Sequence, residues 1–232
     1  MLRVEITVES GTASFRLGEL VDQVETALLC SLRVRSEHPH EPVRVEHLPI
    51  PWRTVGCGNY AAVFLHPEHP DLVVKVYAPG REGIQDEAEV YRRIGRHPAF
   101  SECLHVGRQY LVLARLQGHT LYDCVCRGIR IPPQAMHDID TALAYAKARG
   151  LFAHDVHGRN LMLHQGRGFI VDISDFLNPD PCRAWQDLLV AYRWIYLPLI
   201  APLNLRIPAA LMDSVRRGYR LYRRLRRRST LR

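Results

Sequence analysis

The residues best suited to chemistry lie between positions 153 and 172. Asp155 and Asn160 stand five residues apart in a short polar stretch that follows an expected helix, and an apolar run ends in Asp172. Phosphoryl transfer needs a carboxylate that accepts a hydroxyl proton, together with an amide and a second carboxylate that hold Mg²⁺. These residue types at this spacing therefore indicate phosphoryl transfer.

A glycine-containing turn at residues 55–63 is the second candidate. Gly56 and Gly58 stand between two expected strands. Glycines lack a Cβ atom, so backbone N–H groups beside them can approach phosphate oxygens. A dinucleotide-binding fingerprint requires a helix after the glycines, and the two prolines before the apolar run 72–77 argue against one. Alone, the turn is weak evidence, because most such glycine pairs are simple turns.

The third candidate is Lys75, which lies within the expected strand 72–77, 17 residues after Gly58. A lysine on a strand beside the glycine turn can reach nucleotide phosphates, whereas an outward-facing surface lysine is the commoner case. A carboxylate partner on the following helix favours the phosphate role. Glu87 and Glu89 are both available on that helix.

Taken in order, these features resemble the protein-kinase-like superfamily over about residues 52–190. The glycine loop, the strand lysine, a helix glutamate, the D-x-x-x-x-N loop and a later aspartate occur in the order and with the spacing of that family. The resemblance implies an α+β, two-lobed protein-kinase-like fold with a small β-rich N-lobe and a truncated helical C-lobe. It also implies ATP and Mg²⁺ as cofactors.

The resemblance assigns a role to each polar residue. Lys75 would hold the α- and β-phosphates of ATP and pair with Glu87, with Glu89 as the alternative. Asp155 would be the catalytic base. Asn160 and Asp172 would bind Mg²⁺. The expected catalytic set is therefore Asp155, Lys75, Glu87 and Asn160.

Nucleotide contacts are implied along the N-lobe as well. Residues 110–116 would form its last strand and the hinge. Leu113 would stand at the back of the pocket, and the backbone of Ala114 and Leu116 would bind adenine. The expected nucleotide-binding residues are Gly56, Cys57, Gly58, Val63, Lys75, Leu113, Ala114 and Leu116.

Departures from the family pattern bear on regulation. The usual H-R-D reads A-H-D at 153–155, so the arginine that commonly pairs with an activation-loop phosphate is missing. The usual D-F-G reads D-I-S at 172–174, although another aspartate, Asp175, precedes a phenylalanine. We prefer Asp172 as the metal ligand because it directly ends the apolar strand. Asp187 would begin the helix that anchors the catalytic loop.

Other departures bear on the substrate. His157 stands where protein Ser/Thr kinases carry a lysine, which is similar to aminoglycoside and choline kinase-like phosphotransferases and to some minimal bacterial kinases. Only 15 residues separate Asp172 from Asp187, which leaves no room for a long activation loop. The leading prediction is a minimal bacterial, effector-type protein Ser/Thr kinase with an unidentified phosphate acceptor. The alternatives are a small-molecule kinase, favoured by His157, and a partner-binding pseudokinase, against which the intact charged set argues.

Three regions follow from the pattern of apolar residues and turn signals. Residues 1–50 form an N-terminal extension made of a hairpin (2–8 with 13–17), a helix (20–32) and a Pro/His-rich linker (36–51), in which 43–45 is an alternative short strand. Residues 51–116 form the kinase N-lobe and hinge, and 117–232 the minimal C-lobe with an Arg-rich tail. Strands are expected at 52–56, 61–65, 72–77 and 109–114, and helices at about 84–94 and 132–149.

The basic character of the chain is confined to its tail. The net charge is +7, but residues 213–232 hold nine Arg and one Asp, a net charge of +8, so the other 212 residues carry −1. Such a tail predicts a solvated terminal helix or contact with an acidic partner or an anionic surface. We expect an apolar stripe within 211–225 to dock on the C-lobe and 226–232 to be disordered.

The expected location is the cytoplasm, with export as an effector left open. Six cysteines are scattered without C-x-x-C pairs, which favours reduced thiols. The first residues are charged rather than apolar, and the uncharged run 194–205 is too short and too rich in proline to span a bilayer.

Overall fold

The computed structural model of the chain describes residues 10–38 and 41–229. The chain divides into two compact units. The first extends to His97 and includes Ser101–Leu116, and the second comprises Pro98–Phe100 and the chain from Gln117 onward. Helices and antiparallel sheets occur together, so the expected α+β class is confirmed. The boundaries expected near residues 50 and 116 stay predictions.

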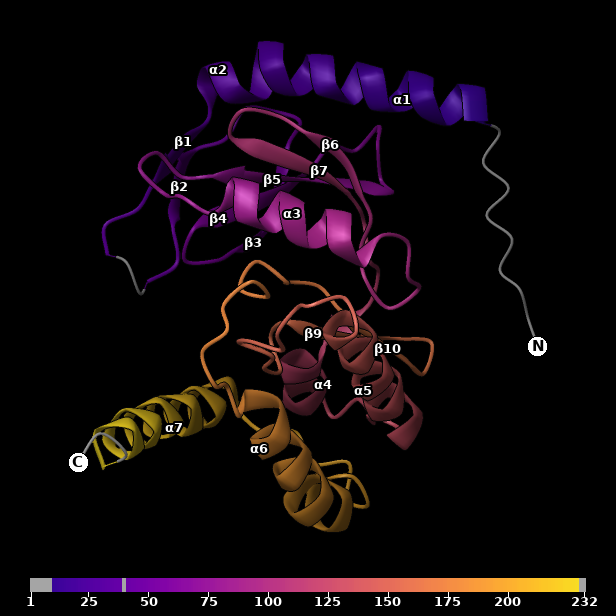
Figure 1. The fold of residues 1–232 in the computed structure, drawn as a ribbon. Coiled ribbons are helices and arrows are strands. Elements are labelled where there is room, and N and C mark those ends of the chain that lie inside the picture. The colour runs from indigo at the N-terminus through magenta and orange to yellow at the C-terminus, as the bar shows by residue number, and fades with distance from the viewer. Residues whose placement is uncertain (1–9, 39–40, 230–232) are drawn as a thin grey trace. The chain divides into compact units, whose positions relative to one another are not determined.

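A five-stranded antiparallel sheet forms the centre of the first unit (Figure 1). In spatial order its strands are β3 (Arg53–Cys57), β4 (Ala61–Leu65), β5 (Leu72–Tyr77), β7 (Tyr110–Ala114) and β6 (Cys103–Val106). The three middle strands are short apolar runs bounded by turn residues, which is the pattern of strands buried on both faces. The edge strand β6 was not expected, because its alternation is short and only partly apolar.

Side-chain alternation gives this sheet two distinct faces. The strand register places Gly56, Val63, Lys75 and Leu111 in one row across four strands. Helix α3 (Ile84–Ile94) supplies the carboxylate that binds Lys75 on this face. The intervening residues belong to a buried cluster on the other face, which includes Ala62, Phe64, Val74, Val76, Tyr110 and Val112.

The N-terminal helix covers that other face. Helical structure is continuous through α1 (Ser10–Gln23), the π-helical turn η1 (Val24–Leu28) and α2 (Leu29–Ser31), and α1 lies along the sheet in Figure 1. Three side chains spaced four residues apart are 0% exposed and join the buried cluster of the sheet: Leu20, Val24 and Leu28. This helix therefore completes the core of the unit.

The expected N-terminal hairpin is wrong where the structure tests it. Residues 13–17 are helical, and the strand expected at 2–8 lies outside the described residues. The alternation of apolar and polar residues over five positions is compatible with either a strand or the end of a helix. Here the helix forms because the apolar residues that follow, Leu20, Val24 and Leu28, are buried on one helical face.

The expected linker holds a strand. Strand β2 (Arg44–His47) pairs with β1 (Arg33–Arg35) in a two-stranded antiparallel sheet. Val43 is 3% exposed, and its N–H donates to the carbonyl oxygen of Gly58 at 2.8 Å. The segment before β2 is therefore hydrogen-bonded to the glycine turn.

The second unit is mainly helical and contains a three-stranded antiparallel sheet in the order β10-β9-β8. Its strands are β8 (His119–Thr120), β9 (Leu161–His164) and β10 (Arg167–Ile170), and its first helices are α4 (Leu121–Arg127) and α5 (Pro133–Lys147). The proline at the start of α5 is well placed, because the first N–H groups of a helix have no partner within it.

Helix α5 packs directly on β10. A Cβ atom at Gly168 would lie 2.1 Å from the carbonyl oxygen of Ala135. Only glycine permits this approach between helix and strand. The contact fixes the hairpin of β9 and β10 on the helix.

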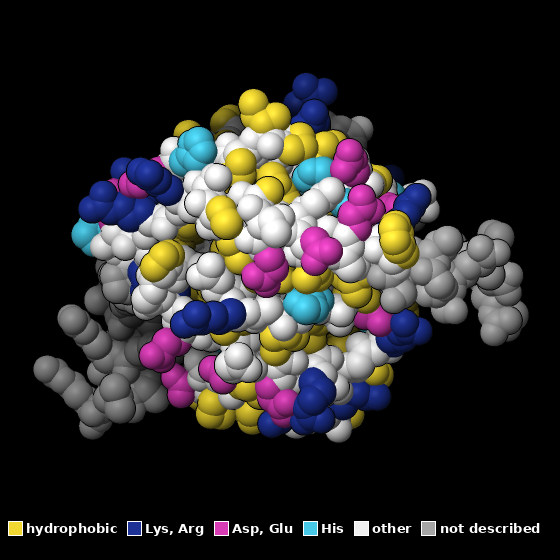
Figure 2. All heavy atoms as spheres, turned by 90° about the horizontal axis from the view of Figure 1, so that it is seen from above, with side chains coloured by type: hydrophobic (Ala, Val, Ile, Leu, Met, Phe, Trp, Pro, Cys, Tyr) yellow, Lys and Arg dark blue, Asp and Glu magenta, His cyan; other side chains and the backbone are white. Residues whose placement is uncertain are grey.

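Three further helical segments end the chain: α6 (Ala184–Ala191), η2 (Tyr192–Ile200) and α7 (Ala209–Ser229). No helix in the described ranges has both the length and the apolar character needed to span a bilayer. On the face that Figure 2 shows, basic and acidic side chains are interspersed. That mixture agrees with the near-neutral body expected outside the tail.

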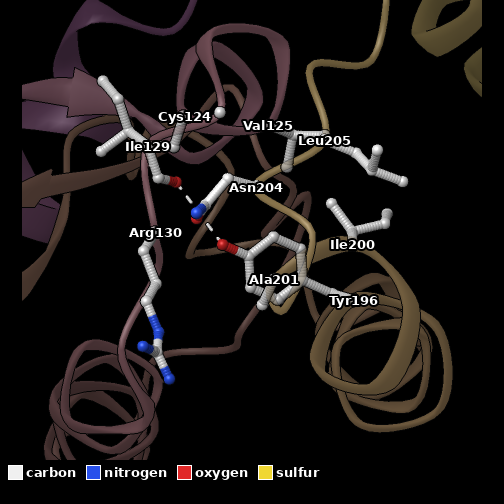
Figure 3. A pocket seen from close by; sticks show the side chains of 10 residues that line it. Cys124, Val125, Ile129, Arg130, Tyr196, Ile200, Ala201, Asn204 and Leu205 are labelled. Carbon is white, nitrogen blue, oxygen red and sulfur yellow. Dashed lines mark hydrogen bonds between the residues drawn. The ribbon is translucent and has the colours of Figure 1, made fainter.

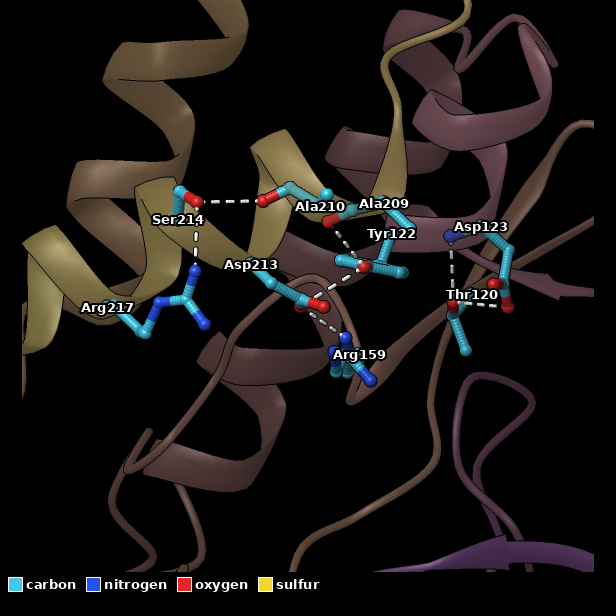
Figure 4. A network of polar contacts seen from close by, with 9 residues as sticks. All are labelled: Thr120, Tyr122, Asp123, Arg159, Ala209, Ala210, Asp213, Ser214 and Arg217. Carbon is cyan, nitrogen blue, oxygen red and sulfur yellow. Dashed lines mark hydrogen bonds and ion pairs between the residues drawn. The ribbon is translucent and has the colours of Figure 1, made fainter.

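Helix α7 is held by polar contacts rather than by the expected apolar stripe. Leu211 and Val215 are 53% and 60% exposed, so the stripe is not buried there. Instead, Asp213 accepts hydrogen bonds from Arg159 at 2.7 Å and from Tyr122 at 3.1 Å (Figure 4). The helix also continues through residues 226–229, which were expected to be disordered, whereas 230–232 lie outside the described residues.

Replacing Leu28 by Ala should lower the free energy of unfolding by about 2–5 kcal/mol, because it leaves a cavity between helix and sheet. Urea denaturation followed by circular dichroism measures this. Phe15→Ala is the matched control, since the Phe15 side chain is 75% exposed, and its effect should stay within about 0.5 kcal/mol. Equal stability of the Leu28→Ala variant and the parent would show that the helix does not support the sheet.

Candidate functional site

A buried ion pair joins Lys75 to Glu87 in the first unit. The two residues are 9% and 0% exposed. The Lys75 Nζ atom lies 2.9 Å from Oε1 and 2.7 Å from Oε2 of Glu87, and the Tyr77 hydroxyl donates to the same carboxylate. Burial, and then the charge of Glu87, raises the pKa of the Cys103 thiol to about 11. Because the desolvation cost of a buried pair often exceeds its Coulombic gain, stability alone does not explain this one.

Helix α3 positions Glu87. The helix follows Gly83, whose φ of 118° favours glycine, and it buries Glu87, Val90, Tyr91 and Ile94 along one stripe. Glu87 lies in the first turn, where the positive end of the helix dipole favours a carboxylate. Glu89 lies on another face and binds the side chains of Arg92 and Arg93. The structure therefore brings Glu87, rather than Glu89, to Lys75.

The glycine turn keeps open space beside its backbone. The Gly58 N–H donates to the carbonyl oxygen of Ala61 at 2.8 Å, which closes the turn between β3 and β4. A Cβ atom at Gly56 would meet nothing within 4 Å, and one at Gly58 would meet the oxygen of Ala61 at 3.6 Å, an ordinary contact. Neither glycine is required by the fold. Cys57 between them is exposed, and Val63 across the ladder is half-buried.

The expected hinge residues lie at the end of β7. Leu113 is 5% exposed. The Ala114 N–H donates to the carbonyl oxygen of Glu102 at 2.8 Å, and the Ala114 carbonyl accepts from the Ser101 hydroxyl at 2.6 Å. Only the second lone pair of that carbonyl remains for a further donor such as an adenine amino group. Leu116 is the last residue of the first unit.

The expected catalytic loop lies between α5 and β9 in the second unit. Asp155 has a φ of 53°, a left-handed conformation that Asp adopts more readily than most residues. The Asn160 Nδ2 atom donates to the Asp155 carbonyl oxygen at 3.1 Å, and the Asn160 N–H donates to the His157 carbonyl at 2.8 Å. The Asp155 side chain is 43% exposed, with Oδ2 3.7 Å from Nε2 of His157. An exposed carboxylate on a backbone that is held in this way suits a general base.

The hairpin of β9 and β10 brings Asn160 beside the segment that carries Asp172. Leu161 pairs with Ile170, so the residues just outside the two strands also meet. There the Val171 N–H donates to the Asn160 carbonyl at 3.0 Å. The Asn160 amide nitrogen is already bound to the loop, which leaves its side-chain oxygen as the possible ligand atom. Oxygen ligands of these types fit Mg²⁺.

Asp175 has a different environment. Its carbonyl accepts from the Asn178 N–H at 3.0 Å, within the turn that follows Asp172. Its Oδ2 atom lies 4.0 Å from Nδ1 of His154, whereas Oδ1 of Asp172 accepts from the Ser174 N–H at 3.2 Å. Asp172 thus directly follows the residue that binds the Asn160 backbone, whereas the Asp175 carboxylate faces His154.

Three contacts of this loop were missed by reasoning from sequence. The Tyr122 N–H donates to the Gly158 carbonyl at 2.9 Å, which anchors the loop on α4. Arg159 lies 3.9 Å over the Tyr122 ring and binds Asp213 of α7 (Figure 4). No motif signals these contacts, because the partners are far apart in the sequence. Asp187 lies in the first turn of α6, as expected, and accepts from the Tyr219 hydroxyl at 2.7 Å.

Two pockets of the second unit lie away from these residues. One, of about 10 Å³, has room for about one water molecule. The Tyr196 hydroxyl donates to the Ile129 carbonyl at its edge (Figure 3). The other, of about 370 Å³, is lined by residues around β8 and the turn between β9 and β10. None of the expected site residues lines either pocket.

Comparison with known proteins gives one informative sequence match. No family model matches the chain. "Putative serine/threonine-protein kinase YrzF" of Bacillus subtilis (strain 168) is 29% identical over 151 residues, which are 64% of this chain and 70% of that protein. The crystal structure of the Mycobacterium tuberculosis PknI kinase domain is 23% identical with a TM-score of 0.43, covering 56% of this chain and 59% of that one, less than two thirds of its length. The expected resemblance of this chain to the protein-kinase-like superfamily is thereby confirmed.

Proposed function

We propose that this chain is an ATP- and Mg²⁺-dependent kinase that transfers a phosphoryl group to an alcohol, with Ser or Thr of a protein as the leading acceptor. The buried pair of Lys75 and Glu87 carries the proposal. Kinases of this superfamily need such a pair in place to hold the nucleotide phosphates. The name of the Bacillus relative supports a protein acceptor.

The residues of the second unit supply the remaining roles. Asn160 and Asp172 would hold Mg²⁺ through their side-chain oxygens, and the bound ion would neutralise charge on the phosphates. Asp155 would accept the proton of the acceptor hydroxyl. The hydrogen bond from Asn160 to the Asp155 backbone couples these two functions, because a shift of the metal ligand also moves the base.

A small-molecule acceptor is the second candidate. His157 stands 3.7 Å from the Asp155 carboxylate, at the position where protein Ser/Thr kinases carry lysine. Helix α6 begins at Ala184, so little chain after Asp172 is available to bind a peptide. A screen of labelled phosphate transfer from ATP to proteins and to amino alcohols separates the two candidates.

Location and partners complete the proposal. All six cysteines are free thiols in the structure, which suits the cytoplasm. The Arg-rich helix α7 would contact an acidic partner or an anionic surface, because its positive charge is concentrated there. Such contact would weaken as salt rises.

Lys75→Met should lower phosphate transfer by about 100-fold or more, because the ammonium charge stabilises the phosphates in the transition state. Lys147→Met, at an exposed position, is the matched control and should keep full activity. Loss of Lys75 alone leaves the buried charge of Glu87 without a partner, which destabilises the fold. The double variant Lys75→Met/Glu87→Gln removes that charge too and allows the test to be made on a folded chain. Full transfer by a folded double variant would overturn the role of Lys75.

Asp172→Asn should lower the affinity for Mg·ATP by about tenfold or more, because it removes a charged oxygen ligand from the metal. Asp175→Asn should change the affinity little, since Asp175 lies beside His154. Titration with ATP in the presence and absence of Mg²⁺ measures both. If Asp175→Asn has the larger effect, the metal ligand is assigned three residues too early.

Gly58→Ala should weaken ATP binding while leaving the melting temperature unchanged or slightly raised. The added methyl group makes only ordinary contact in the folded chain, and alanine restricts the unfolded chain, but the methyl would occupy space needed by a phosphate. Gly218→Ala, also in open space, serves as the control. Unaltered ATP affinity in the Gly58→Ala variant would mean that the turn does not cover the nucleotide.

A further inference from the structure

A cluster of three potential metal ligands lies in the first unit, on the turn between β4 and β5. One ligand atom each from His66, Glu68 and His69 lies within 4.8 Å of the others. Both histidines are 5% exposed, whereas the side chain of Glu68 is 67% exposed. The cluster is therefore buried on its imidazole side and open on its carboxylate side.

Two successive turns shape this cluster. The His69 N–H donates to the His66 carbonyl at 3.1 Å, and the Leu72 N–H donates to the His69 carbonyl at 3.1 Å. The sequence H-P-E-H-P puts a proline at the second position of each turn, where its fixed φ is already suitable. The chain thus brings the two imidazoles to a centroid distance of 5.7 Å. The Trp52 ring packs edge-on against His66 at 4.9 Å.

The hydrogen bonding of the cluster is incomplete. Neither ring nitrogen of His69 has a hydrogen-bond partner among the residues that the structure describes, although both atoms are buried. His66 Nδ1 accepts only a long bond of 3.4 Å from the Glu68 N–H. The Gln23 amide donates to Glu68 Oε2 at 3.3 Å, while its own oxygen is buried and, within the described chain, also lacks a donor. Buried polar atoms without partners are costly, so a missing ligand is expected here.

We propose that His66, Glu68 and His69 bind a divalent transition metal of the Zn²⁺ class. Two imidazoles and one carboxylate are a ligand set that zinc uses with a fourth, open position. Nitrogen ligands disfavour Mg²⁺ and Ca²⁺, which prefer oxygen. The site is thus chemically different from the oxygen ligands of Asn160 and Asp172.

The metal would join two parts of the first unit. Gln23, which contacts Glu68, is the last residue of α1, and the turn leads directly into β5, the strand of Lys75. The far side of the turn is held by Arg115, whose N–H donates to the Asp71 carbonyl at 2.7 Å. Metal binding should therefore stabilise the packing of the N-terminal helix against the strand that carries Lys75.

Titration of the chelator-treated full chain with Co²⁺ and Zn²⁺ in Mg²⁺-free buffer tests the site. We expect saturation at one equivalent, visible absorption bands from the Co²⁺ complex and a higher melting temperature with Zn²⁺. Glu68→Gln, at a side chain that is 67% exposed, should weaken binding by about tenfold or more. His69→Gln should abolish it.

His47→Gln is the matched control, because His47 is exposed on β2, outside the cluster, and the variant should bind metal like the parent chain. Lack of saturable binding by the parent would overturn the proposal. So would one equivalent bound with equal affinity by the parent, Glu68→Gln and His69→Gln chains, since the metal would then lie elsewhere.

Discussion

The ion pair of Lys75 and Glu87 sets the strictest requirement on the first unit. Two charges removed from water lose several kcal/mol of solvation each, and this loss is offset only when the carboxylate is fully hydrogen-bonded. The Glu87 carboxylate of α3 receives these hydrogen bonds from two side chains of β5, Lys75 and Tyr77. The rest of the unit serves to hold these three groups in register.

The N-terminal helix is part of this requirement. Because α3 occupies one face of the sheet, the other face needs a second apolar layer to exclude water from β5. Leu20, Val24 and Leu28 provide that layer. A hydrogen bond from Gln23 to Glu68 connects the helix to the turn between β4 and β5. A second bond, from Val43 to Gly58, connects the segment before β2 to the glycine turn. The N-terminal helix thus belongs to the same core as the strand of Lys75.

The second unit positions its polar residues mainly through backbone hydrogen bonds rather than through a buried ion pair. Backbone hydrogen bonds at the open end of the β9–β10 hairpin set the spacing of Asn160 and the segment leading to Asp172. Arg159 of the same loop forms an ion pair with Asp213 of α7. Helix α7 is therefore connected to the loop of Asp155 and Asn160, although its residues Leu211 and Val215 are exposed.

Local pattern was enough to identify β4, β5, α3 and α5 and the order of the glycine turn, Lys75, Asp155, Asn160 and Asp172, because strand alternation, helical periodicity and turn residues act over a few positions. Tertiary packing decided the rest. Glu87 and Glu89 are about 200° apart around a helix, so the orientation of α3 on the sheet selects between them. Packing also made residues 13–17 helical, left Leu211 and Val215 exposed on α7 and brought Gln23 to Glu68. Such contacts join residues tens of positions apart, and their free energies depend on which surfaces pack together. The periodicity within one segment does not determine that choice.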